Sequence, residues 1–240
     1  MPMPPPTPPA PAGPLLSVIV PVYNEAATIA RVLERVAAAP FDKEILVVDD
    51  GSSDGTPGIL RGLEGKDGVR VLRLERNRGK GAALRRAIPE TRGEVVVFQD
   101  ADLEYDPQDY ARLLEPIQRF GADAVYGSRF LGAHRVFLFW HYLGNRFLTL
   151  VTNVLFNTNL TDMETGAKAI RGQVLRGLRL SAARFDIEPE LTARLFQKGY
   201  RVFEVPIAYS GRSYSEGKKI GWRDGVQALW RLVRCRLTRP

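Results

Sequence analysis

The chain has 240 residues, of which 45% are hydrophobic and 25% charged, with a formal net charge of +7. These values are typical of a globular protein of about one domain, and they exclude a collagen-like chain, a wholly disordered chain and a bundle of membrane spans. The charge is concentrated near the C-terminus, where residues 212–240 hold eight Lys/Arg against two acids. The single cysteine, Cys235, cannot form an internal disulfide, so we expect a reducing, cytoplasmic environment.

Residues 1–14 contain eight prolines, which favours a disordered, polyproline-like tail rather than a secretory signal. From residue 15 onward, short runs rich in Val, Ile, Leu and Phe alternate with helix-forming segments. The apolar runs predict strands at 16–22, 44–49, 69–74, 94–99 and 123–126. The segments between them predict helices at 25–39, 56–63, 80–88 and 108–120. This alternation is typical of an α/β fold with a Rossmann-like, mostly parallel sheet covered by helices on both faces.

The rhythm changes after residue 127. An apolar, helix-like segment at 136–156 is long enough to span a bilayer, but it contains several polar residues and Arg146, which argue against a crossing. The remaining segments are a turn-rich 157–167, a helix near 188–198, a strand at 201–206, a polar loop at 210–219 and a terminal helix at 221–237. We expect one domain over 15–220, followed by a basic amphipathic helix over 221–240.

Four predicted strands end in polar clusters. The clusters are Tyr23-Asn24-Glu25, Asp49-Asp50-Gly51-Ser52, Asp100-Ala101-Asp102-Leu103-Glu104 and Gly127-Ser128-Arg129. Any one of them alone is typical of an ordinary turn or helix cap. Because ligands of parallel α/β sheets bind beyond the carboxyl ends of the strands, four such clusters indicate a binding site at that edge.

The pair Asp100 and Asp102 has a specific chemical use. Two carboxylates one residue apart can converge on a hard divalent cation where the backbone turns at a strand end, and Mg²⁺ or Mn²⁺ prefers oxygen ligands. Gly79-Lys80-Gly81 lacks the spacing of a P-loop, so a metal-bridged diphosphate fits better than an NTPase site. The basic residues between 73 and 86, Lys80 included, are expected to form a solvated surface.

Five runs, in this order and spacing, resemble a family 2 glycosyltransferase with the GT-A fold: SVIVPVYNE, ILVVDDGSSDGT, NRGKGAALRRAI, GEVVVFQDADLEYDP and VYGSRF. The later runs TDMETGAKAIR, GYRVFEVPI and GRSYSEGKKIGW are similar to the branch that includes dolichol-phosphate mannosyltransferase and related polyprenyl-phosphate glycosyltransferases. The resemblance covers about residues 15–225.

The resemblance implies roles for individual residues. The nucleotide's base and ribose would be held by Pro21, Tyr23, Glu25 and Asp50. The metal and the diphosphate would be held by Asp100 and Asp102, with backbone contact from Ala101 and a place in the metal shell for Glu104. The basic residues that meet the diphosphate and the acceptor's phosphate would be Arg129, Arg212 and Lys218. Asp162 and Lys168 match family positions without an assigned role.

The implied activity is inverting transfer of a hexose, mannose before glucose, from GDP-mannose or a UDP-hexose to dolichyl or undecaprenyl phosphate, which gives a β-linked product. A phosphate acceptor is already ionised near neutrality (second pKa about 6) and needs no general base. A hydroxyl acceptor needs one. Asp186, Glu188 and Glu190 are candidate bases, although acids at a helix start also serve as caps.

Two other functions stay open at this point: a family 2 glycosyltransferase acting on a sugar or small-molecule hydroxyl, and a non-catalytic nucleotide- or nucleic-acid-binding module. The basic residues between 73 and 86 lack the interleaved aromatics of a single-strand platform, so no nucleic acid is expected as a partner.

A membrane surface is an expected partner. Six residues of the terminal helix fall within an arc of about 100°: Trp222, Val226, Leu229, Trp230, Val233 and Leu237. Such a helix can lie in a lipid interface, and it can equally pack on the protein's own core. Because this helix and residues 136–156 flank the predicted acceptor pocket, we expect peripheral attachment to the cytoplasmic face of a membrane.

Overall fold

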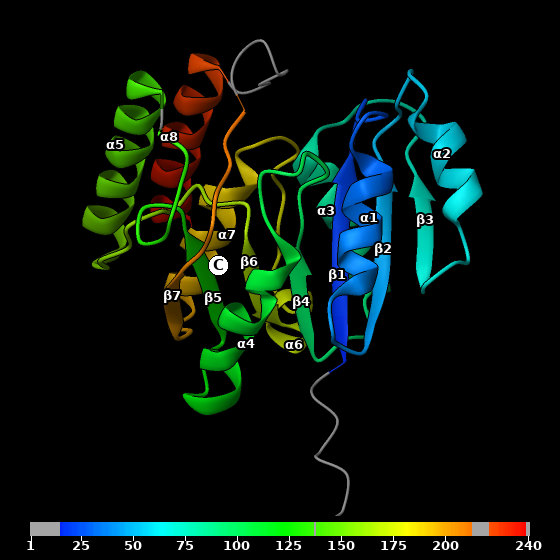
Figure 1. The fold of residues 1–240 in the computed structure, drawn as a ribbon. Helices are drawn as coiled ribbons and strands as arrows, with labels where there is room; N and C mark the ends of the chain where they lie inside the picture. Colours follow the sequence, from blue (N-terminus) through cyan, green and yellow to red (C-terminus); the bar gives the residue numbers. More distant parts are fainter. Residues whose placement is uncertain (1–14, 137, 213–220, 239–240) are drawn as a thin grey trace, which may run out of the picture.

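A computed structural model describes residues 15–136, 138–212 and 221–238 (Figure 1). Within these ranges the chain forms a seven-stranded sheet in the order β3-β2-β1-β4-β6-β5-β7. Its strands are β1 (Leu16–Val22), β2 (Lys43–Asp49), β3 (Val69–Arg73), β4 (Val95–Phe98), β5 (Ala124–Ser128), β6 (Lys168–Arg171) and β7 (Val202–Pro206). Strand β6 is antiparallel to β4 and β5, and the other neighbouring pairs are parallel.

Helices cover both faces of this sheet (Figure 1). One face carries α1 (Ile29–Ala38), α2 (Thr56–Leu63) and α4 (Tyr110–Arg119). The core on the other face includes α3 (Lys80–Ala87), α5 (Phe139–Phe156), α6 (Gly172–Arg176), α7 (Ile187–Gln197) and α8 (Trp222–Leu237). Two short 3-10 helices, η1 (Ile88–Glu90) and η2 (Pro107–Asp109), follow α3 and precede α4.

Strand β1 shows why the sequence forms this sheet. Its side chains alternate in direction: Val18 and Val20 enter the core beneath α1 and α4, and Ile19 enters the core beneath α3 and α7. All three are fully buried. A strand that is buried on both faces needs an uninterrupted apolar run, which is the pattern that predicted it.

The predicted GT-A-like α/β fold with a mostly parallel sheet is confirmed. Strand β6 was not predicted, because its four residues acquire strand geometry by pairing with β4 and β5, and a short segment carries little information about such partners. Helix α1 begins at Ile29 rather than residue 25. The residues before it form a turn in which the backbone N–H groups of Asn24 and Glu25 donate to Ser52 and Thr56.

Helices α5 and α8 lie side by side next to the β5–β7 end of the sheet (Figure 1). Ala228, Leu232 and Cys235 of α8 are buried, and Arg231 forms an ion pair with Asp186 at the start of α7. Helix α8 therefore shares the core of the domain. None of the helices in the described ranges combines the length and the apolar character that a bilayer crossing requires.

Candidate active site

The strand-end clusters converge at one edge of the sheet. Glu25 follows β1, the two acids Asp100 and Asp102 follow β4, and Arg129 follows β5. Strands β1 and β4 are parallel neighbours, so their carboxyl ends meet there. Arg212, which follows β7, reaches the same place and contacts both Glu25 and Asp102.

The guanidinium of Arg212 lies among three carboxylates. Its Nη2 donates to Asp102 Oδ2 at 2.9 Å, its Nη1 is 3.2 Å from Glu25 Oε2, and its Nε is 3.5 Å from Glu104 Oε1. The backbone N–H of Arg212 also donates to Glu104 at 2.8 Å. When all three acids are ionised, one guanidinium does not neutralise them. In that state the cluster attracts further positive charge.

Backbone geometry brings Asp102 and Glu104 together. Leu103, between them, has a φ of 65°, in the left-handed region that a leucine rarely adopts. The backbone N–H of Glu104 donates to Asp102 Oδ1 at 3.2 Å. Burial, followed by repulsion from Asp100 and Glu104, raises the pKa of Asp102 to about 7 despite the opposing charge of Arg212.

Asp100 belongs to a second cluster, in which two ammonium groups and two carboxylates alternate. Lys80 Nζ lies 2.7 Å from Asp100 Oδ1 and 3.1 Å from Glu188 Oε1, and Lys168 Nζ donates to the other oxygen of Glu188. Burial lowers the pKa of Lys80, but Asp100 and Glu188 outweigh it and raise that pKa above its ordinary value. Burial raises the pKa of Glu188, and the two lysines reverse this and hold it below its usual range.

The expectation that Lys80 lies on a solvated surface is wrong, because its side chain is only 13% exposed. The start of α3 packs against the segment at 182–184: a Cβ on Gly79 or Gly81 would lie 2.6 Å from a carbonyl oxygen of that segment. The Gly-Lys-Gly run was the available sequence signal, since two glycines permit this close approach. Asp50 fixes the same loop by accepting from the backbone N–H groups of Arg78 and Gly79.

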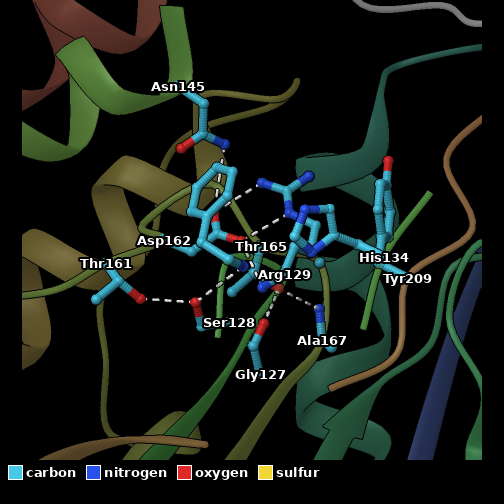
Figure 2. A network of polar contacts seen from close by, with 12 residues as sticks. Gly127, Ser128, Arg129, His134, Asn145, Thr161, Asp162, Thr165, Ala167 and Tyr209 are labelled. Carbon is cyan, nitrogen blue, oxygen red and sulfur yellow. Dashed lines mark hydrogen bonds and ion pairs between the residues drawn. The ribbon is translucent and has the colours of Figure 1, made fainter. Parts of the chain in front are cut away.

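Arg129 is held by Asp162 in a buried ion pair (Figure 2). The Nε and Nη2 atoms of Arg129 each donate to one oxygen of Asp162 at 2.7 Å, and the Arg129 backbone N–H donates at 3.0 Å. Asn145 of α5 donates to Asp162 at 3.2 Å. Burial raises the pKa of Asp162, but Arg129 outweighs it and holds that pKa below its usual value. Asp162, whose role was open, thus orients Arg129.

Two tyrosines connect these clusters. The ring of Tyr209 lies beneath the Arg129 guanidinium, with its centroid 5.3 Å from Cζ, and its hydroxyl donates to Glu104 at 2.7 Å. Tyr105 packs on Tyr209 and accepts a hydrogen bond from the backbone N–H of Gly166. Neither tyrosine was predicted as a site residue from the sequence. The isolated aromatic after the Asp100–Glu104 run was a weak signal, because aromatic residues are common in any core.

Two of the three candidate bases are tied to structural contacts. Asp186 accepts from Arg231 of α8 and from the backbone N–H of Arg184. Glu190 accepts from the backbone N–H groups of residues 181 and 182 and from the Ser181 hydroxyl. Only Glu188 of the three contacts the cluster that contains Asp100.

The other predicted site residues are placed as follows. Pro21 lies in β1, Tyr23 follows it, and both are partly buried. Ala101 is buried, and its carbonyl accepts from the Thr28 hydroxyl at 2.7 Å. Lys218 lies outside the described residues. The nucleotide contacts assigned to Pro21, Tyr23, Glu25, Asp50 and Ala101 stay predictions.

The side chains around Asp100 and Asp102 can be compared with the ligands that the predicted Mg²⁺ or Mn²⁺ requires. In the described part of the chain, no three His, Cys, Asp or Glu side chains are grouped so that they could hold a metal ion. The negative charges of Asp100 and Asp102 nevertheless suit a cation. Each carboxylate already lies beside a positively charged side chain, Asp100 beside Lys80 and Asp102 beside Arg212. A divalent ion would also screen the repulsion from Asp100 and Glu104 that, after burial, raises the pKa of Asp102. Glu104, which is engaged by Tyr209 and Arg212, stays a predicted ligand.

Comparison with known proteins identifies the family. A family model described as "Glycosyl transferase family 2" matches residues 17–183. The chain belongs to this family. It is 31% identical over 212 residues to "Dolichol-phosphate mannosyltransferase" of Pyrococcus furiosus, covering 86% of this chain and 59% of that relative. It is 32% identical to "Polyprenol monophosphomannose synthase" of Mycolicibacterium smegmatis, covering 85% of this chain and 80% of the relative.

The fold of this family 2 glycosyltransferase is also found among solved structures. Glucosyl-3-phosphoglycerate synthase from Mycobacterium tuberculosis, in complex with Mn²⁺, UDP and glucosyl-3-phosphoglycerate, superimposes with a TM-score of 0.74. The match covers 95% of this chain and 82% of the other, at 23% identity. At this identity the likeness concerns the fold. The chain spans 59% of the length of the Pyrococcus relative.

Proposed function

We propose that this chain transfers a hexose, with inversion, from a nucleotide-sugar to polyprenyl phosphate. The Pyrococcus and Mycolicibacterium relatives support this acceptor and favour mannose. The donor would be GDP-mannose or a UDP-hexose. The nucleotide would lie against Glu25 and Asp50, and its diphosphate beside Asp100 and Asp102. An acceptor phosphate oxygen would attack the anomeric carbon as the bond from that carbon to the diphosphate breaks. An α-linked donor thus gives a β-linked product.

The charges of the site suit an ionised acceptor and an anionic leaving group. Asp100 and Asp102 would hold the divalent ion, which when bound supplies electrostatic stabilisation of the departing diphosphate. Arg129, oriented by Asp162 and stacked on Tyr209, would meet the acceptor phosphate. Arg212 makes contacts that a bound cation would compete for, which would free its guanidinium for phosphate oxygens.

The contacts of Glu188 with Lys80 and Lys168 bear on the choice of acceptor. Among the three acids that the sequence offered as bases, it alone contacts the Asp100 cluster, and two lysines bind its oxygens. An acid whose pKa is held below its usual range is a poor acceptor for a hydroxyl proton. Glu188 is therefore a poor base for a hydroxyl acceptor, and the two relatives support the choice of a phosphate acceptor, which needs no base.

An apolar face formed by α5 and α8 supports a membrane partner. Its exposed residues are Phe139, Trp140, Leu143, Phe147, Leu150 and Val154 on α5, and Val226, Trp230, Val233 and Leu237 on α8. Arg234 lies over the Trp230 ring with its Cζ 5.1 Å from the centroid, so cationic groups accompany the apolar ones. A face of this kind matches a lipid interface with anionic headgroups, where a polyprenyl tail must remain. We therefore extend the proposal to peripheral attachment to a membrane.

The experiment that tests the function is a donor panel. Purified protein, a short-chain polyprenyl phosphate and Mg²⁺ or Mn²⁺ are incubated separately with GDP-mannose, UDP-glucose and UDP-N-acetylglucosamine, and the extracted lipid is analysed by mass. We expect one donor to give a lipid of one added hexose. In a parallel incubation with a water-soluble sugar acceptor, a glycosylated sugar without any sugar-lipid in the lipid arm would support the hydroxyl alternative. Nucleotide binding without transfer or donor hydrolysis would support a non-catalytic module.

A further inference from the structure

Residues 162–166 form a short segment that touches both halves of the candidate site. At one end, Asp162 holds Arg129 through two hydrogen bonds of 2.7 Å (Figure 2). At the other end, Gly166 lies so close to Asp100 that a Cβ on it would stand 2.4 Å from Asp100 Oδ2. Glu164 is at the centre of this segment. It therefore lies between the predicted diphosphate side and the predicted acceptor side.

Glu164 carries hydrogen-bonding capacity that the protein does not use. Its Oε1 is buried and has no hydrogen-bond partner among the residues that the structure describes. Its charged neighbours come from both sides: Glu188 and Lys168 from the Asp100 cluster, Arg129 and Asp162 from the acceptor side. Burial, followed by repulsion from Glu188, raises the pKa of Glu164 to about 7. A buried carboxyl oxygen without a hydrogen-bond partner costs free energy, and a ligand that donates a hydrogen bond to it would remove this cost.

The backbone on either side of Glu164 is held by hydrogen bonds. Lys168 Nζ donates to the carbonyl oxygens of Met163 and Thr165, on either side of Glu164. The Thr165 hydroxyl donates to the carbonyl of Gly127 at 2.6 Å. The ammonium group of Lys168 thus organises the backbone around Glu164 as well as binding Glu188. The fixed backbone thus sets the position from which the Glu164 side chain can reach a ligand.

We propose that Glu164 binds a hydroxyl group of the donor's sugar and is a specificity-determining residue. This inference rests on the proposed function, because a sugar in transfer lies between the leaving diphosphate and the attacking phosphate. The chemistry of the group selects the ligand: a carboxylate accepts hydrogen bonds from hydroxyls, repels phosphate, and finds no donor on a prenyl chain. A hexose is the part of the reactants that offers such donors at this place.

The test compares binding of nucleotide-sugars with binding of the matching nucleoside diphosphates. Calorimetry with Mg²⁺ is run on GDP-mannose against GDP and on UDP-glucose against UDP, with the unaltered protein and the variants Glu164→Ala and Glu164→Gln. We expect Glu164→Ala to weaken the nucleotide-sugar that binds by about tenfold and to leave its nucleoside diphosphate within about twofold. Glu164→Gln, which retains a hydrogen-bonding oxygen, should lose about threefold, again only for the nucleotide-sugar.

The matched control is Glu115→Ala on α4, an exposed acid paired with Arg119, which should change neither affinity. Equal losses for nucleotide-sugar and nucleoside diphosphate would mean that Glu164 only supports the fold, and would overturn the inference. Unchanged affinities would overturn it as well. If Glu164→Ala does not fold, Glu164→Gln alone decides. If the unaltered protein binds the nucleoside diphosphates but neither nucleotide-sugar, nor any other in the donor panel, the proposed function fails and this inference with it.

Discussion

The ion pair of Arg129 and Asp162 makes a quantitative prediction about stability. Asp162 is fully buried, and the Arg129 side chain is 14% exposed. Asp162→Asn preserves the shape of the side chain but leaves a buried guanidinium without its counter-charge. Removing one partner of a buried pair costs about 3–5 kcal/mol of the free energy of unfolding. We expect a loss of about that size at pH 7, measured by urea denaturation followed by circular dichroism, with an unchanged dependence on urea concentration.

A double-mutant cycle isolates the pair. Arg129→Met leaves Asp162 buried without its partner, whereas the double variant Arg129→Met/Asp162→Asn removes both charges, so its loss should be clearly smaller than the sum of the two single losses. Glu115→Gln, which breaks an exposed pair with Arg119, is the control and should cost no more than about 0.5 kcal/mol. A loss below about 1 kcal/mol for Asp162→Asn, or additive single losses, would refute the argument; the threshold lies well below the range for buried pairs.

The same pair predicts a pH dependence. Arg129 holds the pKa of Asp162 below its unfolded value, which is about 3.9. A carboxyl group with a depressed pKa contributes stability above its unfolded pKa, and this contribution is lost as the pH falls through the folded pKa. The difference in unfolding free energy between the unaltered protein and Asp162→Asn should therefore shrink as the pH falls below about 4. A constant difference down to pH 3 would contradict this.

Three further predictions concern the site and the apolar face. Asp102→Asn should lower metal-dependent turnover at least about 100-fold while the melting temperature changes little, and undiminished turnover at saturating Mg²⁺ would contradict the metal role. Glu188→Gln leaves the buried ammonium group of Lys168 without its counter-charge, so we expect a loss of about 3–5 kcal/mol in the free energy of unfolding; unchanged stability and donor binding with lost turnover would instead indicate a general base. The pair Leu143→Ser and Trp230→Ser should reduce flotation with vesicles of phosphatidylcholine and phosphatidylglycerol, and flotation equal to that of the unaltered protein would argue against lipid docking. These substitutions are preferable to removing residues 221–240, since Leu232 of α8 belongs to the core.

Much of the fold was predictable because its strands are buried on both faces. Strand β1 was predicted with its observed bounds, since an apolar run of that length has few other stable placements. Strand β6 could not be found in the same way. It contains Lys168, whose charge argues against a buried strand until Glu188 and two backbone carbonyls are brought to its ammonium group.

The local sequence also determined the acid pair Asp100 and Asp102, the strand-end clusters and the family. Each of these features depends on the identity and spacing of residues that are adjacent in the sequence. Tertiary structure alone decided which charges meet. Arg212 reaches Asp102 across 110 positions of the chain, and Glu188 meets Lys168 across 20. These contacts depend on the crossing of elements that are distant in sequence, and the burial that shifts their pKa values exists only after the sheet and its helices have closed around them.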